Sequence, residues 1–128
     1  MMILIFGALL GFFSVAFGAY AEHGLREAVT EEHFRFLMTA IGYNQVHAVV
    51  IVAIGLALLN GGKLSNLPAL KWSGLLFIIG TVVFSFSIYL SVSLDIPSLV
   101  NITPVGGMTI MTAWLLLMVA GILVRKKP

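Results

Sequence analysis

Four polar side chains stand close together in an otherwise apolar part of the sequence: Tyr43, Asn44, Gln45 and His47. On a helix, Tyr43 and His47 lie nearly in line, Asn44 lies beside His47, and Gln45 points away from them. A phenol, a carboxamide and an imidazole can bind a ligand or a proton, and they can equally bond to one another. Because polar groups inside a membrane are costly, they usually face the interior of a helix bundle.

Further polar residues extend this set into other parts of the chain. His23 follows the first apolar stretch, and serine and tyrosine residues lie at 85–89. Two histidines with only Glu22 nearby form a weak metal-binding pattern, so we expect no metal and no cofactor. The complete candidate polar cluster comprises His23, Tyr43, Asn44, His47, Ser85, Ser87, Tyr89 and Thr103.

The sequence lacks the motifs of common enzyme classes. It has no phosphate-binding P-loop, no dinucleotide-binding glycine motif, no GxSxG nucleophile elbow and no HExxH zinc motif. It has no cysteine, which excludes thiol chemistry and thiolate metal sites. We therefore predict that the protein is not an enzyme.

The composition indicates which solvent surrounds these side chains. Of 128 residues, 60% are hydrophobic and only 9% are charged, whereas soluble domains carry about 25% charged residues. A chain this short cannot bury so much apolar surface in one aqueous core, so lipid is the expected solvent. The net charge of +2 gives no support for nucleic-acid binding. We expect an all-α membrane protein whose main partner is the lipid bilayer.

Transmembrane helices need about 20 mostly apolar residues, and four segments of one domain, 1–128, meet this requirement. The charge-rich stretch between the first two can begin a helix at Thr30, a good N-cap residue. We interpret 26–38 as a short interfacial helix or as a helical extension of the second span. The four spans are expected at about 2–20, 40–59, 72–94 and 105–124.

An alternative interpretation of the N-terminal segment is a cleaved signal peptide. Ala19-Tyr20-Ala21 has the form of a signal-peptidase site. A signal peptide also has a positively charged start, and no lysine or arginine precedes this one. We therefore favour a retained first span.

Basic residues mark the cytoplasmic side of a membrane protein. Five of the seven basic residues lie between spans two and three or after span four, and only Arg26 and Arg35 lie on the other side. Both termini are therefore expected in the cytoplasm, with the 22–38 connector outside. This topology gathers the polar cluster in the outer half of the membrane and leaves the inner half nearly all apolar.

Two functions remain open for the polar cluster. The first is structural, in a non-enzymatic accessory or scaffold protein, where a neutral His47 would bond to Tyr89 or Ser85. The second is a small pocket, open to the outer face, that binds or transports a small ligand, a lipid or an ion. That pocket would be formed by His23, Tyr43, Asn44, His47, Tyr89 and Thr103.

Small residues indicate where the helices pack, because they let two backbones approach closely in lipid. The first span carries a stripe of glycines, the third carries Gly80, and the fourth begins with two more. Tight packing inside one bundle explains this pattern, and a homo-oligomer or another membrane protein in contact with the stripe is a second interpretation. The predicted packing positions are Gly7, Gly11, Gly18, Gly106 and Gly107.

Several stretches resemble one known family in their order along the chain. GAYAEHGL at 18–25 resembles a GAFGAH(A/G)L signature, and the pattern at 36–48 resembles FxxTAxxYxxxHA. SFSIY at 85–89 and ITPVGG at 102–107 are similar to SGSLY and ITPIGG. These patterns belong to the YgdD/YwdK-like small membrane proteins, or domain of unknown function 423, and the chain departs from the first one at Ala21 and Glu22. The resemblance implies a four-span protein of bacterial type, in the cell (inner) membrane, without an established activity.

Overall fold

The computed structural model describes residues 1–126, and every regular element in that range is helical. Four helical rods are long and apolar enough to cross a membrane. The first combines α1 (Met2–Tyr20) with a π-helical turn, η1 (Ala21–Leu25), and the second is α2 (Glu31–Leu59). The third combines α3 (Pro68–Thr81), the π-helical turn η2 (Val82–Phe86) and α4 (Ser87–Ser93), and the fourth combines the 3-10 helix η3 (Pro97–Ile102) with α5 (Thr103–Lys126).

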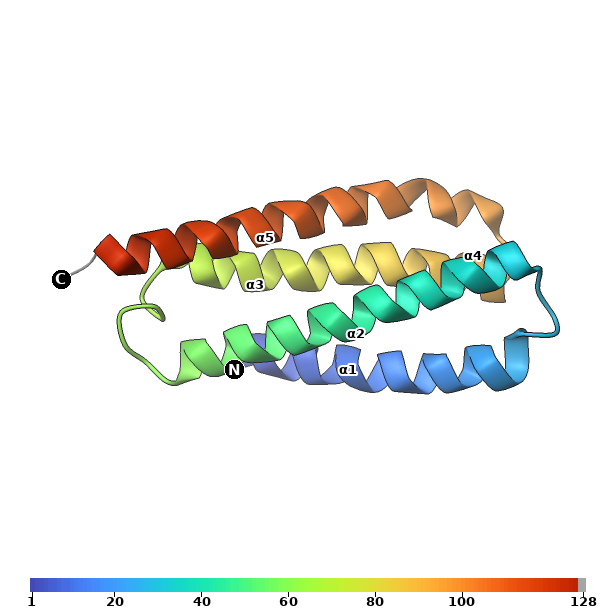
Figure 1. Cartoon of the computed structure of the whole chain (residues 1–128), viewed down its shortest axis with the longest axis horizontal. Helices are drawn as coiled ribbons and strands as arrows, with labels where there is room; N and C mark the ends of the chain where they lie inside the picture. Colours follow the sequence, from blue (N-terminus) through green and yellow to red (C-terminus); the bar gives the residue numbers. More distant parts are fainter. Residues whose placement is uncertain (127–128) are drawn as a thin grey trace.

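The rods lie side by side along the long axis of the molecule (Figure 1). α1 packs along α2, α3 packs along α5, and α2 joins the two pairs through its contacts with α3. The N-terminus, the end of α5 and the connector after α2 lie at one end of the bundle. The connectors 26–30 and 94–96 lie at the opposite end. Each consecutive pair of rods is therefore a helical hairpin.

The sequence allowed either a separate interfacial helix at 26–38 or a helical extension of the second span. The separate helix is wrong, and the extension is what the structure has. α2 begins at Glu31, directly after Thr30, whose side-chain oxygen accepts a hydrogen bond from the His33 N–H at 3.1 Å. No glycine or proline interrupts the helix before Gly42, so the segment continues into the second span. At the other side, η1 prolongs the first rod to Leu25. Only residues 26–30 remain as a connector.

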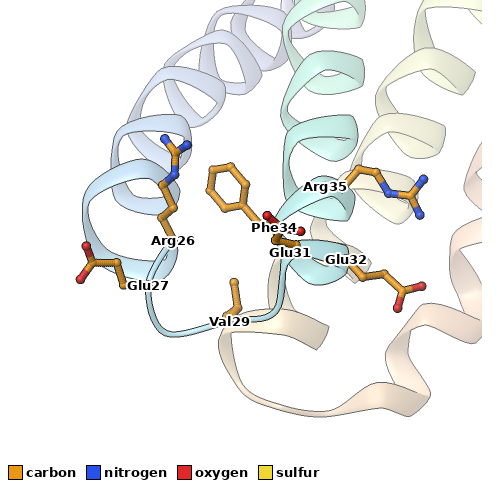
Figure 2. A pocket seen from close by; sticks show the side chains of 7 residues that line it. All are labelled: Arg26, Glu27, Val29, Glu31, Glu32, Phe34 and Arg35. Carbon is orange, nitrogen blue, oxygen red and sulfur yellow. The ribbon is translucent and has the colours of Figure 1, made fainter.

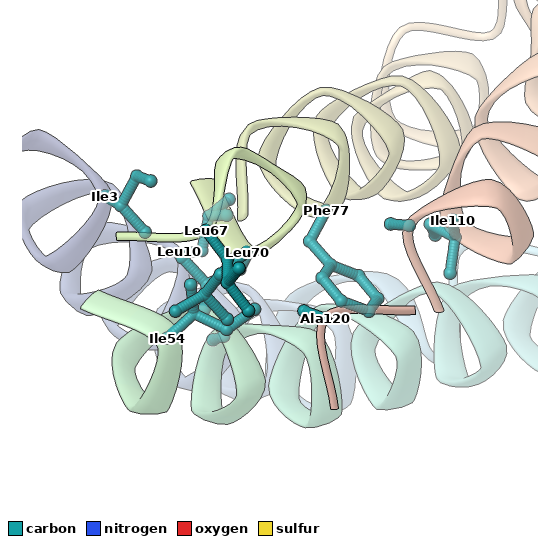
Figure 3. Close-up of a cluster of buried hydrophobic side chains, with 11 residues drawn as sticks. Ile3, Leu10, Ile54, Leu67, Leu70, Phe77, Ile110 and Ala120 are labelled. Atoms are coloured by element: carbon teal, nitrogen blue, oxygen red, sulfur yellow. The ribbon is translucent and has the colours of Figure 1, made fainter. Parts of the chain in front are cut away.

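Two apolar clusters fill the bundle. One lies towards the end that carries both termini and includes Phe77, Ile51 and Leu70 (Figure 3). The other lies towards the opposite end and includes Leu37, Ile41 and Tyr89. Many large apolar side chains lie on the outside instead of the inside. This inversion fits a surface that faces lipid rather than water.

Four glycines allow the closest helix contacts: Gly7, Gly55, Gly80 and Gly106. A Cβ atom at Gly7 would lie 2.8 Å from the Val52 backbone nitrogen, so Gly7 packs against α2 of its own chain. Gly80 and Gly106 face each other between α3 and α5, and a Cβ at Gly106 would lie 2.4 Å from the Phe84 nitrogen. The other predicted packing positions, Gly11, Gly18 and Gly107, would place a Cβ at ordinary contact distances of 3.7–3.8 Å.

Candidate functional site

The candidate polar cluster divides into buried and exposed members. Six of its eight residues are buried between the helices: Asn44, His47, Ser85, Ser87, Tyr89 and Thr103. Tyr43 is 44% exposed, and His23 is exposed in η1, beyond the end of α1. The structure therefore brings together the residues of the spans and leaves His23 outside.

Asn44 and Tyr89 connect the second rod with the third. The Asn44 Nδ2 group donates a hydrogen bond to the Tyr89 hydroxyl at 3.1 Å. The Tyr89 ring stacks on Phe17 of α1, with 4.0 Å between ring centroids. Asn44 Oδ1 is buried and has no hydrogen-bond partner among residues 1–126. The pair thus joins three rods and leaves one acceptor atom unsatisfied.

Two serines make further contacts around the π-helical turn. The Ser85 hydroxyl lies within η2 and donates to the Ala40 carbonyl of α2 at 2.8 Å. The Ser87 hydroxyl donates to the Phe84 carbonyl at 2.9 Å and lies 2.6 Å from the Thr103 hydroxyl. Because Ser87 has one hydrogen to donate, Thr103 is the donor in that contact. These bonds connect the third rod to α2 and to α5.

His47 is held from both sides of its ring. Nδ1 lies 2.7 Å from the Tyr43 carbonyl, and Nε2 accepts a hydrogen bond from the Trp114 indole N–H at 3.2 Å. A carbonyl can only accept, and an indole N–H can only donate. His47 is therefore neutral in this arrangement, with its proton on Nδ1. The expected partners, Tyr89 and Ser85, were wrong: they bond elsewhere, and His47 faces α5 instead.

Sequence reasoning missed two members of the interhelical network. One is Trp114, whose indole N–H bonds to His47. The other is Ser73, whose hydroxyl donates to the Ala113 carbonyl at 2.9 Å. A signal was present, because Ser73 lies seven residues before Gly80 and so on the same face of the helix. Ser73 lies near the start of the third rod, so buried polar groups are not confined to the half of the bundle that carries the connectors 26–30 and 94–96.

A charged surface lies at the end of the bundle that carries the connectors 26–30 and 94–96, which we call the connector end. A hollow of about 680 Å³ opens there between the connector 26–30 and the start of α2 (Figure 2). Arg26 forms an ion pair with Glu22 and lies over the Phe34 ring at 5.2 Å. The hollow carries both signs of charge and is lined by Arg26, Glu27, Val29, Glu31, Glu32, Phe34 and Arg35.

Metal binding finds no support in the placement of the acidic and histidine side chains. Within residues 1–126, no three His, Cys, Asp or Glu side chains are grouped as metal ligands. His23 is exposed at the connector end, whereas His47 is only 5% exposed and lies inside the bundle. The two histidines thus occupy different environments.

Comparison with known proteins gives a consistent result over nearly the whole chain. Residues 17–107 match the model of a family described as "Protein of unknown function (DUF423)". The chain is 32% identical to the UPF0382 inner membrane protein YgdD of Escherichia coli, over 97% of this chain and 92% of the relative. It is 33% identical to a UPF0382 membrane protein of Haemophilus influenzae, over 84% and 83% of the two chains. It is also 29% identical to the UPF0382 membrane protein YwdK of Bacillus subtilis, over 93% and 94%. No solved structure matches the chain.

Proposed function

Because the chain belongs to the DUF423 family of multi-pass membrane proteins, we propose that it is a non-enzymatic accessory or scaffold protein of the cell (inner) membrane. In this role the buried polar side chains hold the bundle in one shape. The surfaces at its two ends and around its sides are then the parts that other molecules contact.

One observation carries this proposal: the buried side chains of the candidate polar cluster bond to other helices. Asn44, His47, Ser85, Ser87 and Thr103 each contact a neighbouring rod through a hydrogen bond. A catalytic or ligand-binding group needs a free donor or acceptor that faces an accessible space. Most donors and acceptors of this cluster are used within the protein, which supports a structural role.

We also propose that both termini face the cytoplasm. Lys63, Lys71 and the basic residues Arg125 and Lys126 follow or flank the ends of the rods on the side that carries both termini. Arg26 and Arg35 lie at the opposite end. The distribution of lysine and arginine sets the orientation of most multi-pass proteins, so the connector hollow faces outward.

A melting experiment tests the structural role. We expect His47→Ala to lower the melting temperature of the purified protein in detergent, because it removes two hydrogen-bond contacts and leaves a cavity. Small ligands, lipids and ions added to the wild-type protein should leave its melting temperature unchanged. A ligand that stabilises wild type and no longer stabilises His47→Ala would contradict the structural proposal.

The charged hollow favours one second candidate, a protein that binds a small ligand, a lipid or an ion at its outer face. Arginines and glutamates in one hollow suit a zwitterionic head group, with a phosphate and an amine. This site differs from the pocket expected from the sequence, since His47 and Tyr89 do not line it. Phosphatidylethanolamine should raise the melting temperature of the wild-type chain and leave that of Arg35→Gln unchanged. This result would support the candidate. Equal melting with and without the lipid would exclude it.

A further inference from the structure

The Gln45 side chain is a polar group on the outside of the bundle. Gln45 is exposed, and its carboxamide makes no hydrogen bond within residues 1–126. Other polar side chains on the outer surface of the spans form a hydrogen bond within their own helix. The exposed Thr112, for example, donates to the Met108 carbonyl of its own helix at 3.0 Å. Gln45 has no such internal partner.

The depth of Gln45 in the membrane follows from its neighbours. The uncharged helix α1 covers 19 residues, Met2–Tyr20, so its middle is near Gly11. Gly11 lies against Ala48, with 3.8 Å between an added Cβ and the Ala48 Cβ, so Ala48 marks the middle of the membrane on α2. Gln45 is three residues away, or about 4.5 Å at 1.5 Å per residue. With a hydrocarbon core about 30 Å thick, its Cα lies about 10 Å from the interface.

A glutamine side chain cannot bridge that distance to reach water. An unsatisfied carboxamide in hydrocarbon is costly, whereas polar side chains that bond across helices stabilise association in lipid. The position therefore points to a partner that supplies both a hydrogen-bond donor and an acceptor inside the membrane.

The surface beside Gln45 is shaped for such a partner. A groove of about 440 Å³ runs between α1 and α2. Small side chains form part of its floor, and Gln45 is its polar member together with Ser14, whose hydroxyl already donates to the Gly11 carbonyl at 2.7 Å. No charged residue lines it. The lining residues are Gly7, Ala8, Gly11, Ser14, Val15, Gln45, Ala48, Val49 and Val52.

We propose that this groove is a homodimer interface, in which a second copy of the chain packs α1 and α2 against the same helices and the two Gln45 carboxamides bond to each other. A carboxamide is its own complement, because its N–H and C=O can pair with the C=O and N–H of an identical group. A two-fold axis near Gln45 satisfies both side chains at once and brings the two grooves together. This partner does not depend on the scaffold role proposed above.

Fluorescence energy transfer between full-length chains in liposomes tests the interface. The chain has no cysteine, so Glu27→Cys in the connector gives one labelling site outside the membrane. We expect energy transfer that rises with the protein-to-lipid ratio.

Gln45→Leu should weaken association about tenfold, which corresponds to one or two amide hydrogen bonds in lipid. Ala8→Phe should weaken it as well, because the ring fills the groove. Thr112→Val, a polar residue of α5 with an internal partner, should leave association unchanged.

Two results would overturn the dimer. One is a wild-type chain that stays monomeric at every protein-to-lipid ratio, in which case another helix or lipid fills the groove. The other is an association that Gln45→Leu and Ala8→Phe leave at its wild-type strength. Folding is checked separately, because Gln45 makes no hydrogen bond within residues 1–126. Gln45→Leu should therefore melt at or above the wild-type temperature in dilute detergent, whatever the outcome for the His47 network.

Discussion

A hydrogen bond between helices has a different value in lipid than at a protein surface, because no water replaces it when it breaks. Measured values in membrane proteins are nevertheless modest, at roughly 0.6–2 kcal/mol. The network here contains several such bonds, and three of them connect the α1–α2 hairpin with the rest of the bundle: those of Asn44, Ser85 and His47. These bonds join α2 to the third rod and to α5, so they constrain how the two pairs of rods pack against each other.

The Trp114–His47 contact gives a sharp test at the residue scale. Trp114→Phe keeps an aromatic ring against Phe77, where the rings are edge to face at 5.0 Å, but it removes the N–H that His47 accepts. We expect the variant to lose about 1 kcal/mol of stability. A double-mutant cycle with His47→Ala, followed by equilibrium unfolding in detergent, should give a coupling energy of similar size. Trp72→Phe, at an exposed position, is the control and should change little. Strictly additive effects would show that the contact contributes nothing.

The sequence predicted which residues belong to this hydrogen-bond network better than it predicted which residues they bond to. Polar residues in an apolar span are visible in any sequence, and six of the eight candidate residues are buried between helices. Which of them meet depends on helix rotation. A π-helical turn such as η2 inserts an extra residue, which rotates everything after it by about 100° compared with an unbroken α-helix. No residue pattern in the sequence predicted that π-helical turn. The hydrogen-bond partners of His47 and Ser85 therefore could not be deduced.

At the scale of helices, close backbone contact distinguishes neighbouring glycines that look equivalent in the sequence. Gly106→Ala should be strongly destabilising, by about 1–3 kcal/mol, because its methyl group would meet the Phe84 backbone at 2.4 Å and force α5 away from the third rod. Gly107→Ala is the matched control, since its methyl group would lie 3.7 Å from the Phe84 ring. Melting temperatures of the two variants in the same detergent measure the difference. Equal losses would contradict the contact between α3 and α5.

The helices themselves were largely predictable. Their apolar length predicted four long helices, and Thr30 caps α2 as expected. The wrong part was the separate helix at 26–38. Charge made that segment look interfacial, yet charge does not end a helix, and the segment contains no residue between Glu31 and Gly42 that would. The 29-residue α2 is consequently longer than the roughly 20 residues that span the hydrocarbon core.

For the whole molecule, the proposed orientation is testable in intact cells. A cysteine at Glu27 should react with a membrane-impermeant maleimide added from outside, because the connector faces outward in the proposed topology. A cysteine at Asn66, in the connector on the side of the termini, should react only after the cells are permeabilised. The chain has no native cysteine to interfere. Labelling of Asn66→Cys but not Glu27→Cys in intact cells would reverse the topology.

The arrangement of the four rods as two consecutive hairpins also bears on how the protein is made. Each hairpin begins and ends on the same side of the bundle, so each can enter the bilayer as a separate unit during synthesis. The connector at Gly61 and Gly62, both with positive φ, is then a natural place to divide the gene. Residues 1–62 and 63–128, expressed as two polypeptides, should each insert and then co-purify as a complex. Trp114→Phe should reduce that recovery, because the bond it removes is one of those that join the halves.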